Sequence, residues 1–200
     1  MNVRDVIERV RIKITDENAY RFTDENIILI VNDAVRLIRN VFIDEMPEIM
    51  CEPKVTGELA DGENTITVPF NPVRYIDVRC NGRRLHLSAR HGIDDTEAVG
   101  EPELFVPSGI SSIEVYPKPN GVSKYEVFAV KAAEELDIES ELPFPDDFCD
   151  EVIEYTATRL SLIDEFDQSA ETQLISTINS NVANKLQKYA PKEHVVKGYY

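Results

Sequence analysis

The sequence has few of the residues that build common catalytic and metal sites. Its three histidines, His86, His91 and His194, are not spaced from one another, from cysteine or from carboxylates as zinc ligands are. The eight glycines stand singly, so there is no glycine-rich phosphate loop, and no G-x-S-x-G nucleophile motif occurs. We therefore expect no catalytic residue, no metal ligand and no cofactor, and we do not expect an enzyme.

Long apolar runs and closely spaced cysteines are also absent. No stretch approaches the roughly 18 apolar residues that a membrane-spanning helix needs, and the first residues, MNVRDVIERV, contain no apolar signal-peptide core. The three cysteines, Cys51, Cys80 and Cys149, lie far apart and cannot all pair within one chain. We expect reduced, packed thiols in a protein that stays in the cytoplasm where it is made, with no membrane partner.

Basic residues are in the minority. The 200 residues include 37 Asp and Glu against 21 Lys and Arg, which gives a formal net charge of −16. Such a surface repels a phosphate backbone, so sequence-specific or tight DNA binding is not expected. The basic residues gather in the first and last segments, with the acids between them. These runs are either solvated faces, or basic ends that meet acidic surfaces of other subunits or partners.

Apolar residues recur at helical spacing at both ends of the chain. The N-terminal pattern predicts a helix that begins after Asn2 as N-cap, and a second helix that begins after Thr23 and runs to about residue 41. The second helix is apolar around most of its circumference, so it should lie centrally, and Asn32 within it then needs a hydrogen-bond partner or an exposed strip. Two further helices are predicted after residue 143, the last one with Ser169 as its N-cap.

The middle of the chain shows the two-residue alternation of β-strands instead. Asn81-Gly82 lies between two alternating runs and predicts a tight hairpin, and Asp61-Gly62, between VTGEL and NTITV, predicts another. Further strands are expected at 104–106, 112–116 and 124–132. About six short antiparallel strands in fewer than about eighty residues describe a small sandwich or open barrel.

Helices, strands and helices in this order predict an α+β fold. Isolated helices of this length are marginal in water, so the four helices should form one domain that a β domain interrupts. We expect the helical domain to comprise 1–52 and 143–189, the inserted β domain 53–142, and an extended C-terminal tail 190–200. The tail, APKEHVVKGYY, lacks periodicity but carries tyrosines, which are typical interface anchors. It either packs back on its own domain or docks on a partner.

Three segments carry a resemblance to a known family. They are DENIILIVNDAVRLIRN in the second helix, SSIEVYPKP leading through a turn to KYEVFAV, and ELPFPDDFCDEVIEYTATRL, which returns the chain to helix. In this order they resemble the head-to-tail adaptors of short-tailed bacteriophages, also called connectors, gatekeepers or tail tubular protein A. The resemblance covers nearly the whole chain.

The resemblance implies a structural protein of the virion neck without catalytic residues. Such adaptors form a closed ring, usually a dodecamer, that joins the portal protein to the tail or nozzle protein and leaves a channel for passing DNA. Their helical part contacts the portal, their C-terminal segment reaches along it, and their β part lies toward the tail. We expect a portal-docking tail and arginine-based subunit contacts; the tail residues are Val195, Val196, Lys197, Tyr199 and Tyr200, and the arginines are Arg4, Arg9 and Arg11.

Two other functions fit parts of the sequence. A host- or carbohydrate-binding β module on a helical base would need exposed aromatic residues on one sheet face. The candidates are Phe70, Tyr75, Phe105 and Tyr116, which also fit core positions. A small acid/base hydrolase would need a pocket with two inward carboxylates whose pKa values differ, and the sequence offers no pair to name.

Overall fold

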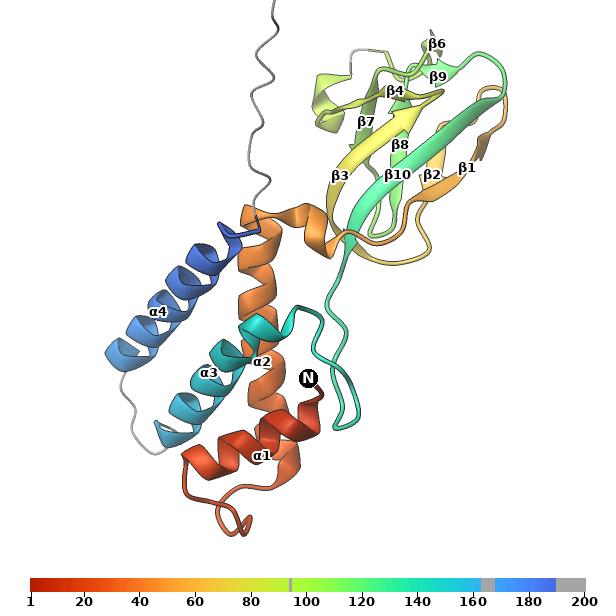
Figure 1. The fold of residues 1–200 in the computed structure, drawn as a ribbon. Coiled ribbons are helices and arrows are strands. Elements are labelled where there is room, and N and C mark those ends of the chain that lie inside the picture. The colour runs from red at the N-terminus through yellow and green to blue at the C-terminus, as the bar shows by residue number, and fades with distance from the viewer. Residues whose placement is uncertain (94, 163–167, 190–200) are drawn as a thin grey trace, which may run out of the picture. The chain divides into compact units, whose positions relative to one another are not determined.

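The computed structural model describes residues 1–93, 95–162 and 168–189. The chain divides into two compact units, which we call the helical unit (Met1–Met46 and Ala133–Tyr200) and the β unit (Pro47–Ala132). The helical unit holds four α-helices and the β unit holds the strands, which confirms the predicted α+β class (Figure 1). Against the expected boundaries, residues 47–52 group with the β unit and residues 133–142 with the helical unit.

Both N-terminal helices begin at side-chain caps. Helix α1 (Val3–Lys13) starts after Asn2, whose side chain accepts the backbone N–H of Asp5. Helix α2 (Asp24–Glu45) starts after Thr23 and ends about one turn beyond the predicted end near residue 41. The two predicted N-caps are confirmed.

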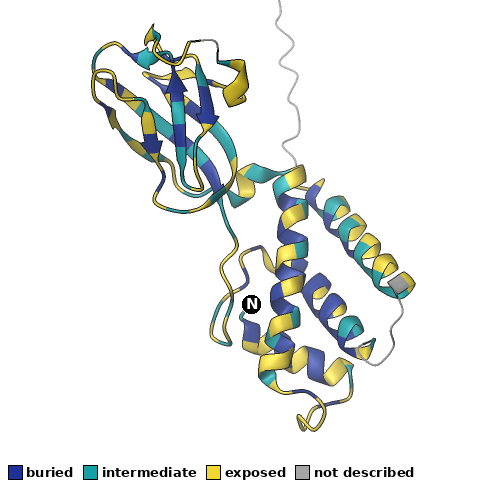
Figure 2. Ribbon diagram, turned by 180° about the vertical axis from the view of Figure 1, so that it is seen from behind, coloured by how far each residue is buried: buried dark blue, intermediate teal, exposed yellow. Residues whose placement is uncertain are grey.

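Helix α2 is the central element of the helical unit. It packs against α1, α3 (Cys149–Ser161) and α4 (Gln168–Leu186), as its apolar circumference predicts. At its C-terminal end, the ring of Phe42 lies 5.9 Å from that of Phe144 and 4.7 Å from that of Phe148. Figure 2 shows its residues by burial. The fully enclosed apolar residues of α2 are Ile27, Val31, Ala34, Val35, Ile38 and Phe42.

The two C-terminal helices follow a short 3-10 turn, η3 (Asp146–Phe148). Helix α4 begins at Gln168, so Ser169, which was predicted to be its N-cap, lies inside the helix instead. Assignments of helix ends vary by a residue or two, so the predicted start of α4 differs from the observed one by little. The buried face of α4 consists of Ile178, Val182 and Leu186.

The β unit is a sandwich of two four-stranded sheets with strand orders β1-β10-β3-β4 and β2-β8-β7-β5, and a third, two-stranded pair is β6-β9. The pairing is antiparallel except for β5 with β7 and β6 with β9. Two 3-10 turns, η1 (Pro47–Met50) and η2 (Arg90–Gly92), complete the unit. The strands are β1 (Val55–Leu59), β2 (Thr65–Thr67), β3 (Pro72–Cys80), β4 (Arg83–Arg84), β5 (His86–Leu87), β6 (Val99–Gly100), β7 (Leu104–Pro107), β8 (Ser112–Tyr116), β9 (Lys118–Pro119) and β10 (Ser123–Lys131).

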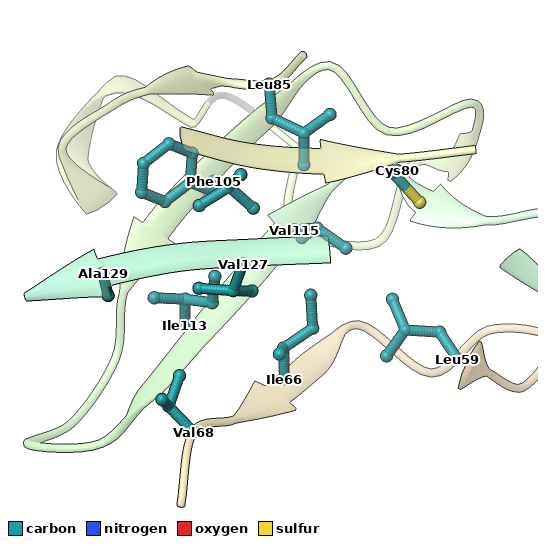
Figure 3. Close-up of a cluster of buried hydrophobic side chains, with 11 residues drawn as sticks. Leu59, Ile66, Val68, Cys80, Leu85, Phe105, Ile113, Val115, Val127 and Ala129 are labelled. Atoms are coloured by element: carbon teal, nitrogen blue, oxygen red, sulfur yellow. The ribbon is translucent and has the colours of Figure 1, made fainter. Parts of the chain in front are cut away.

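The core of the β unit lies between the two large sheets (Figure 3). Phe105 and Tyr116 are buried, the rings of Tyr75 and Phe105 meet edge to face at 5.9 Å, and Phe70 packs against the same cluster. The four aromatic residues considered for a carbohydrate-binding face therefore serve the interior. The central cluster comprises Leu59, Ile66, Val68, Val78, Cys80, Leu85, Phe105, Ile113, Val115, Val127 and Ala129.

The two predicted hairpins have different outcomes. Asn81 and Gly82 take positive φ values of 50° and 79° and join the paired strands β3 and β4, so this hairpin is confirmed. Gly62 also turns the chain, with φ 73°. However, β1 pairs with β10 and β2 pairs with β8, so the turn joins two different sheets and the prediction of a hairpin there is wrong.

The chain enters and leaves the β unit at one place. Cys51 and Val130 form an isolated β-bridge, and the backbone N–H of Glu52 donates to the carbonyl of Ala129 at 3.1 Å. The end of β10 therefore holds the segment that precedes β1.

Candidate interaction surface

Arg11 is enclosed within the helical unit. Its side chain donates to Asp16 Oδ2 at 3.1 Å, to the carbonyl of Phe22 at 3.0 Å and to Asp24 Oδ1 at 2.6 Å, and the residue is only 7% exposed. The guanidinium is thus bound by the loop that follows its own helix. Arg11 therefore stabilises its own chain and is not available for the expected subunit contact. Of the three arginines, only Arg4 and Arg9 remain candidates for that contact.

Asp16 fixes the loop between α1 and α2. Its buried carboxylate accepts the backbone N–H groups of Tyr20, Arg21 and Phe22 at 2.9, 3.1 and 3.1 Å. Burial by itself would raise the pKa of Asp16, but the three backbone hydrogen bonds and the Arg11 guanidinium outweigh it and hold that pKa below its usual value. The carboxylate is therefore charged and acts as the organising centre of the loop.

The fixed loop presents Tyr20 to solvent. The Tyr20 side chain is 89% exposed although its backbone is tied to Asp16. Thr15 and Ala19 take positive φ values of 59° and 55°, which non-glycine residues sustain only where surrounding interactions determine the backbone. Ile12, at the end of α1, is 64% exposed. An ordered loop with an exposed tyrosine has the character of an interface anchor.

Arg9 lies in a surface pocket toward the other end of α1. The pocket has a volume of about 280 Å³. Two of the residues that line this pocket bind each other, because the N-terminal ammonium of Met1 donates to Asp146 Oδ1 at 2.7 Å. The lining residues are Met1, Asp5, Arg9, Asp146, Cys149 and Asp150.

Arg4 is paired within its own unit. Its guanidinium binds the carboxylate of Glu139, in the segment that returns from the β unit to α3, and both side chains are more than half exposed. The same segment is tied to the N-terminus by backbone hydrogen bonds, from Val3 N–H to the Ser140 carbonyl at 2.9 Å and from Leu142 N–H to the Met1 carbonyl at 3.1 Å. Arg4 is therefore accessible to a second copy.

The end of α4 is fixed on the start of α3. Lys185 donates to Glu151 at 2.8 Å and lies 5.8 Å from the centre of the Phe148 ring. The Tyr189 hydroxyl donates to Asp147 Oδ2 at 2.8 Å, and its ring lies 5.9 Å from that of Phe148. The point from which the C-terminal segment departs is thus anchored. The predicted docking residues, Val195, Val196, Lys197, Tyr199 and Tyr200, lie outside the described residues.

Residues 1–93, 95–162 and 168–189 contain no group of three or more His, Cys, Asp or Glu that could hold a metal ion. Across the same ranges, no helix has the length and apolar character to cross a membrane. The three cysteines are free thiols. The buried carboxylates Asp16 and Glu151 are each bound to a cation, Arg11 and Lys185 respectively, so both stabilise the fold.

A protein-family model described as SU10 adaptor protein matches residues 1–190. The chain belongs to this family. Membership confirms the resemblance to phage head-to-tail adaptors and makes the chain a structural protein of the bacteriophage head–tail junction, where portal and tail proteins are its partners. The match spans the helical unit and the β unit of the adaptor together. No curated protein matches the chain.

The loop of this adaptor that displays Tyr20 is not among the features predicted from the sequence. The segment TDENAYRF, between the two predicted N-terminal helices, is polar and lacks helical spacing. One signal was present, because Arg11 lies four residues after Ile7 of the apolar stripe of α1 and a buried guanidinium needs a carboxylate partner. Asp16 and Asp24 were the nearest downstream candidates for that partner.

Proposed function

We propose that this adaptor forms a closed ring of twelve copies, as its resemblance implies, and that the ring joins the portal to the tail of a short-tailed phage. The match to an adaptor family over both units carries this proposal. The ring sits in the virion neck after synthesis in the host cytoplasm, and it lines a channel through which DNA passes.

The charge of the chain supports a channel role. With a net charge of −16, the surface repels the phosphate backbone, so DNA slides past without sequence-specific binding. Repulsion between acidic subunits is damped by salt beyond about 8 Å at physiological ionic strength. Close contacts between opposite charges can then hold neighbouring copies together.

Two sets of residues carry the contacts in this proposal. Arg4 and Arg9, both on α1, contact the neighbouring subunit. The terminal segment 190–200 docks on the portal; it follows the anchored Tyr189, and eleven extended residues reach at most about 40 Å. The β unit contacts the tail protein. The portal-docking residues are Val195, Val196, Lys197, Tyr199 and Tyr200.

Particle mass and symmetry test the ring directly. Native mass spectrometry and electron microscopy of the purified protein, alone and mixed with portal, should show a symmetric ring with a central hole and twelve copies. A protein that stays monomeric in both samples contradicts the proposal, because ring formation on the portal template is the least that it requires.

Truncation after Tyr189 tests the docking segment. We expect unchanged unfolding in urea and at least about a tenfold loss of portal affinity, because the interface anchors are gone. The matched control replaces 190–200 by a Gly/Ser segment of equal length. Restored portal binding in this control would show that the side chains of the segment are not the anchors.

A further inference from the structure

The Tyr20 loop is built to hold an aromatic side chain in solvent. Asp16 is only 6% exposed, and its carboxylate accepts the Tyr20 N–H at 2.9 Å. The buried Arg11 guanidinium binds the same carboxylate. Because the backbone is already ordered, burial of the Tyr20 ring against a partner costs little further loop entropy. The Tyr20 side chain itself is 89% exposed.

The pocket on α1 offers chemistry that suits a tyrosine. In the described part of the chain, the side chains of Asp5, Arg9 and Asp150 have no hydrogen bond or ion pair, and all three line the pocket of about 280 Å³. A guanidinium attracts the face of an aromatic ring, and a carboxylate accepts a hydrogen bond from a phenol hydroxyl.

The turn that forms one wall of this pocket already binds a tyrosine of its own chain. Asp147 accepts the hydroxyl of Tyr189 at 2.8 Å, and Phe148 packs against its ring. Asp146, Cys149 and Asp150 of the same turn line the pocket. The α3 start therefore combines apolar and carboxylate groups in the way that a tyrosine requires.

The Tyr20 loop follows the C-terminal end of α1, whereas the pocket is lined by Met1 and Asp5 at its N-terminal end and by Arg9 further along. Asp5 and Lys13 are eight residues apart, or about 12 Å along the helix axis, and the loop departs beyond Lys13. One chain thus presents the two complementary surfaces on one rigid unit but at separate places. A contact between complementary surfaces of two copies is heterologous, and its repetition closes a ring when the rotation allows it.

We infer that Tyr20 of one copy inserts into the α1 pocket of the next copy, with its ring against Arg9 and its hydroxyl on Asp5 or Asp150. This head-to-tail contact rests on the proposed ring and names the interaction that builds it.

Two variants and their mixture test the contact by native mass spectrometry and sedimentation velocity, with and without portal. Tyr20→Ala removes the inserted side chain. In the other variant, Arg9→Glu places a carboxylate in the pocket where the tyrosine ring would bind. Each variant alone should weaken self-association at least about tenfold. A one-to-one mixture should form dimers and stop there, because the intact Tyr20 of one variant fits only the intact pocket of the other. Leu29→Ala, at a residue 65% exposed on α2, is the matched control and should assemble as the wild type does.

Each contrary result has a distinct meaning. If both variants still form rings as the wild type does, this contact is wrong, but the proposed ring itself is unaffected. Absence of any wild-type ring, even with portal, overturns the proposed function itself. An effect of Arg9→Glu that disappears after truncation at Tyr189 would assign the pocket to the C-terminal segment and overturn the role of Tyr20. Reduced assembly of both variants without dimers in the mixture would also exclude the head-to-tail contact.

Discussion

The side-chain amide of Asn32 hydrogen-bonds both backbone groups of Leu136, 104 residues further along the chain. The Leu136 N–H donates to Asn32 Oδ1 at 2.8 Å, and Asn32 Nδ2 donates to the Leu136 carbonyl at 3.0 Å. The amide pairs with the Leu136 backbone as a neighbouring β-strand would. It thereby fixes the segment around Leu136 on α2. The partner that Asn32 needs on a central helix is therefore a backbone.

Replacement of Asn32 by alanine should lower the free energy of unfolding by about 1–3 kcal/mol, because both Leu136 groups lose their partner at a largely buried position. Urea denaturation followed by circular dichroism measures the change. Asn40→Ala, at an exposed position of the same helix, is the control and should stay within about 0.5 kcal/mol of the wild type. Equal effects of the two substitutions would contradict this role of Asn32.

Gly57 in β1 leaves space that Tyr125 of β10 occupies. A Cβ atom at Gly57 would come within 2.5 Å of Tyr125 Cζ, so the ring would have to move. Gly57→Ala should destabilise the β unit by about 1–3 kcal/mol through overpacking, as measured by thermal unfolding. Adding Tyr125→Ala should make the two effects less than additive, because the second change removes the clash. Thr56→Ala, one residue earlier and exposed, serves as the control.

Acid should weaken the helical unit through Asp16. Its pKa is lower in the folded protein than the ordinary value of 3.8, so the unfolded chain binds the proton more tightly. The stabilisation from the charged carboxylate is complete above the ordinary pKa and is lost as the pH falls through the folded pKa. The pKa values of Asp137 and Asp146 are shifted in the same direction.

Asp16→Asn should therefore be less stable than the wild type at neutral pH. The difference should begin to shrink below about pH 4, where the unfolded wild-type chain takes up the proton, and should shrink further as the pH falls through the lower pKa of the folded protein. Thermal unfolding between neutral pH and about pH 3 checks this. The control is Glu17→Gln, which changes the charge of the exposed neighbour. A stability difference that stays constant across this range would refute the assignment to Asp16.

The three thiols should react with alkylating reagents at different rates. Burial raises the pKa of all three, that of Cys149 to about 11, and Cys80 and Cys149 are almost fully enclosed. At pH 8, on the order of one Cys149 thiol in a thousand is ionised. Peptide mass spectrometry should find Cys51 labelled first, and Cys51→Ser should abolish the fast phase. Labelling of Cys149 as fast as Cys51 would show that the start of α3 opens readily.

Helix caps and turns could be predicted from residues close in sequence, whereas the pairing of strands could be predicted only in part. Asn2 and Thr23 cap their helices because a side-chain oxygen within three residues is all that an N-cap needs. Asn81-Gly82 likewise sets its hairpin. Asp61-Gly62 forms a turn by the same chemistry, but the partners of its flanking strands, β10 and β8, come from distant parts of the chain. That choice depends on the packing of the two sheets.

The candidate surface was predicted only in part. Arg9 and Arg11 were both expected to contact a neighbouring subunit. Arg9 is exposed at a surface pocket, whereas Arg11 faces the interior. Arg11 is four residues from the buried Ile7, a spacing that places the two on one side of the helix. The display of Tyr20 depends on three backbone hydrogen bonds to Asp16, which no residue pattern reveals in advance.

The bridge between Cys51 and Val130 brings the two ends of the β unit together. A unit whose ends meet can be excised and replaced by a short connection, or exchanged for another of different size, with little strain on the rest of the chain. Recombination at these two points would transfer the whole sandwich in one event. The helices and the sandwich can then diverge at different rates among related phages, each under its own selection.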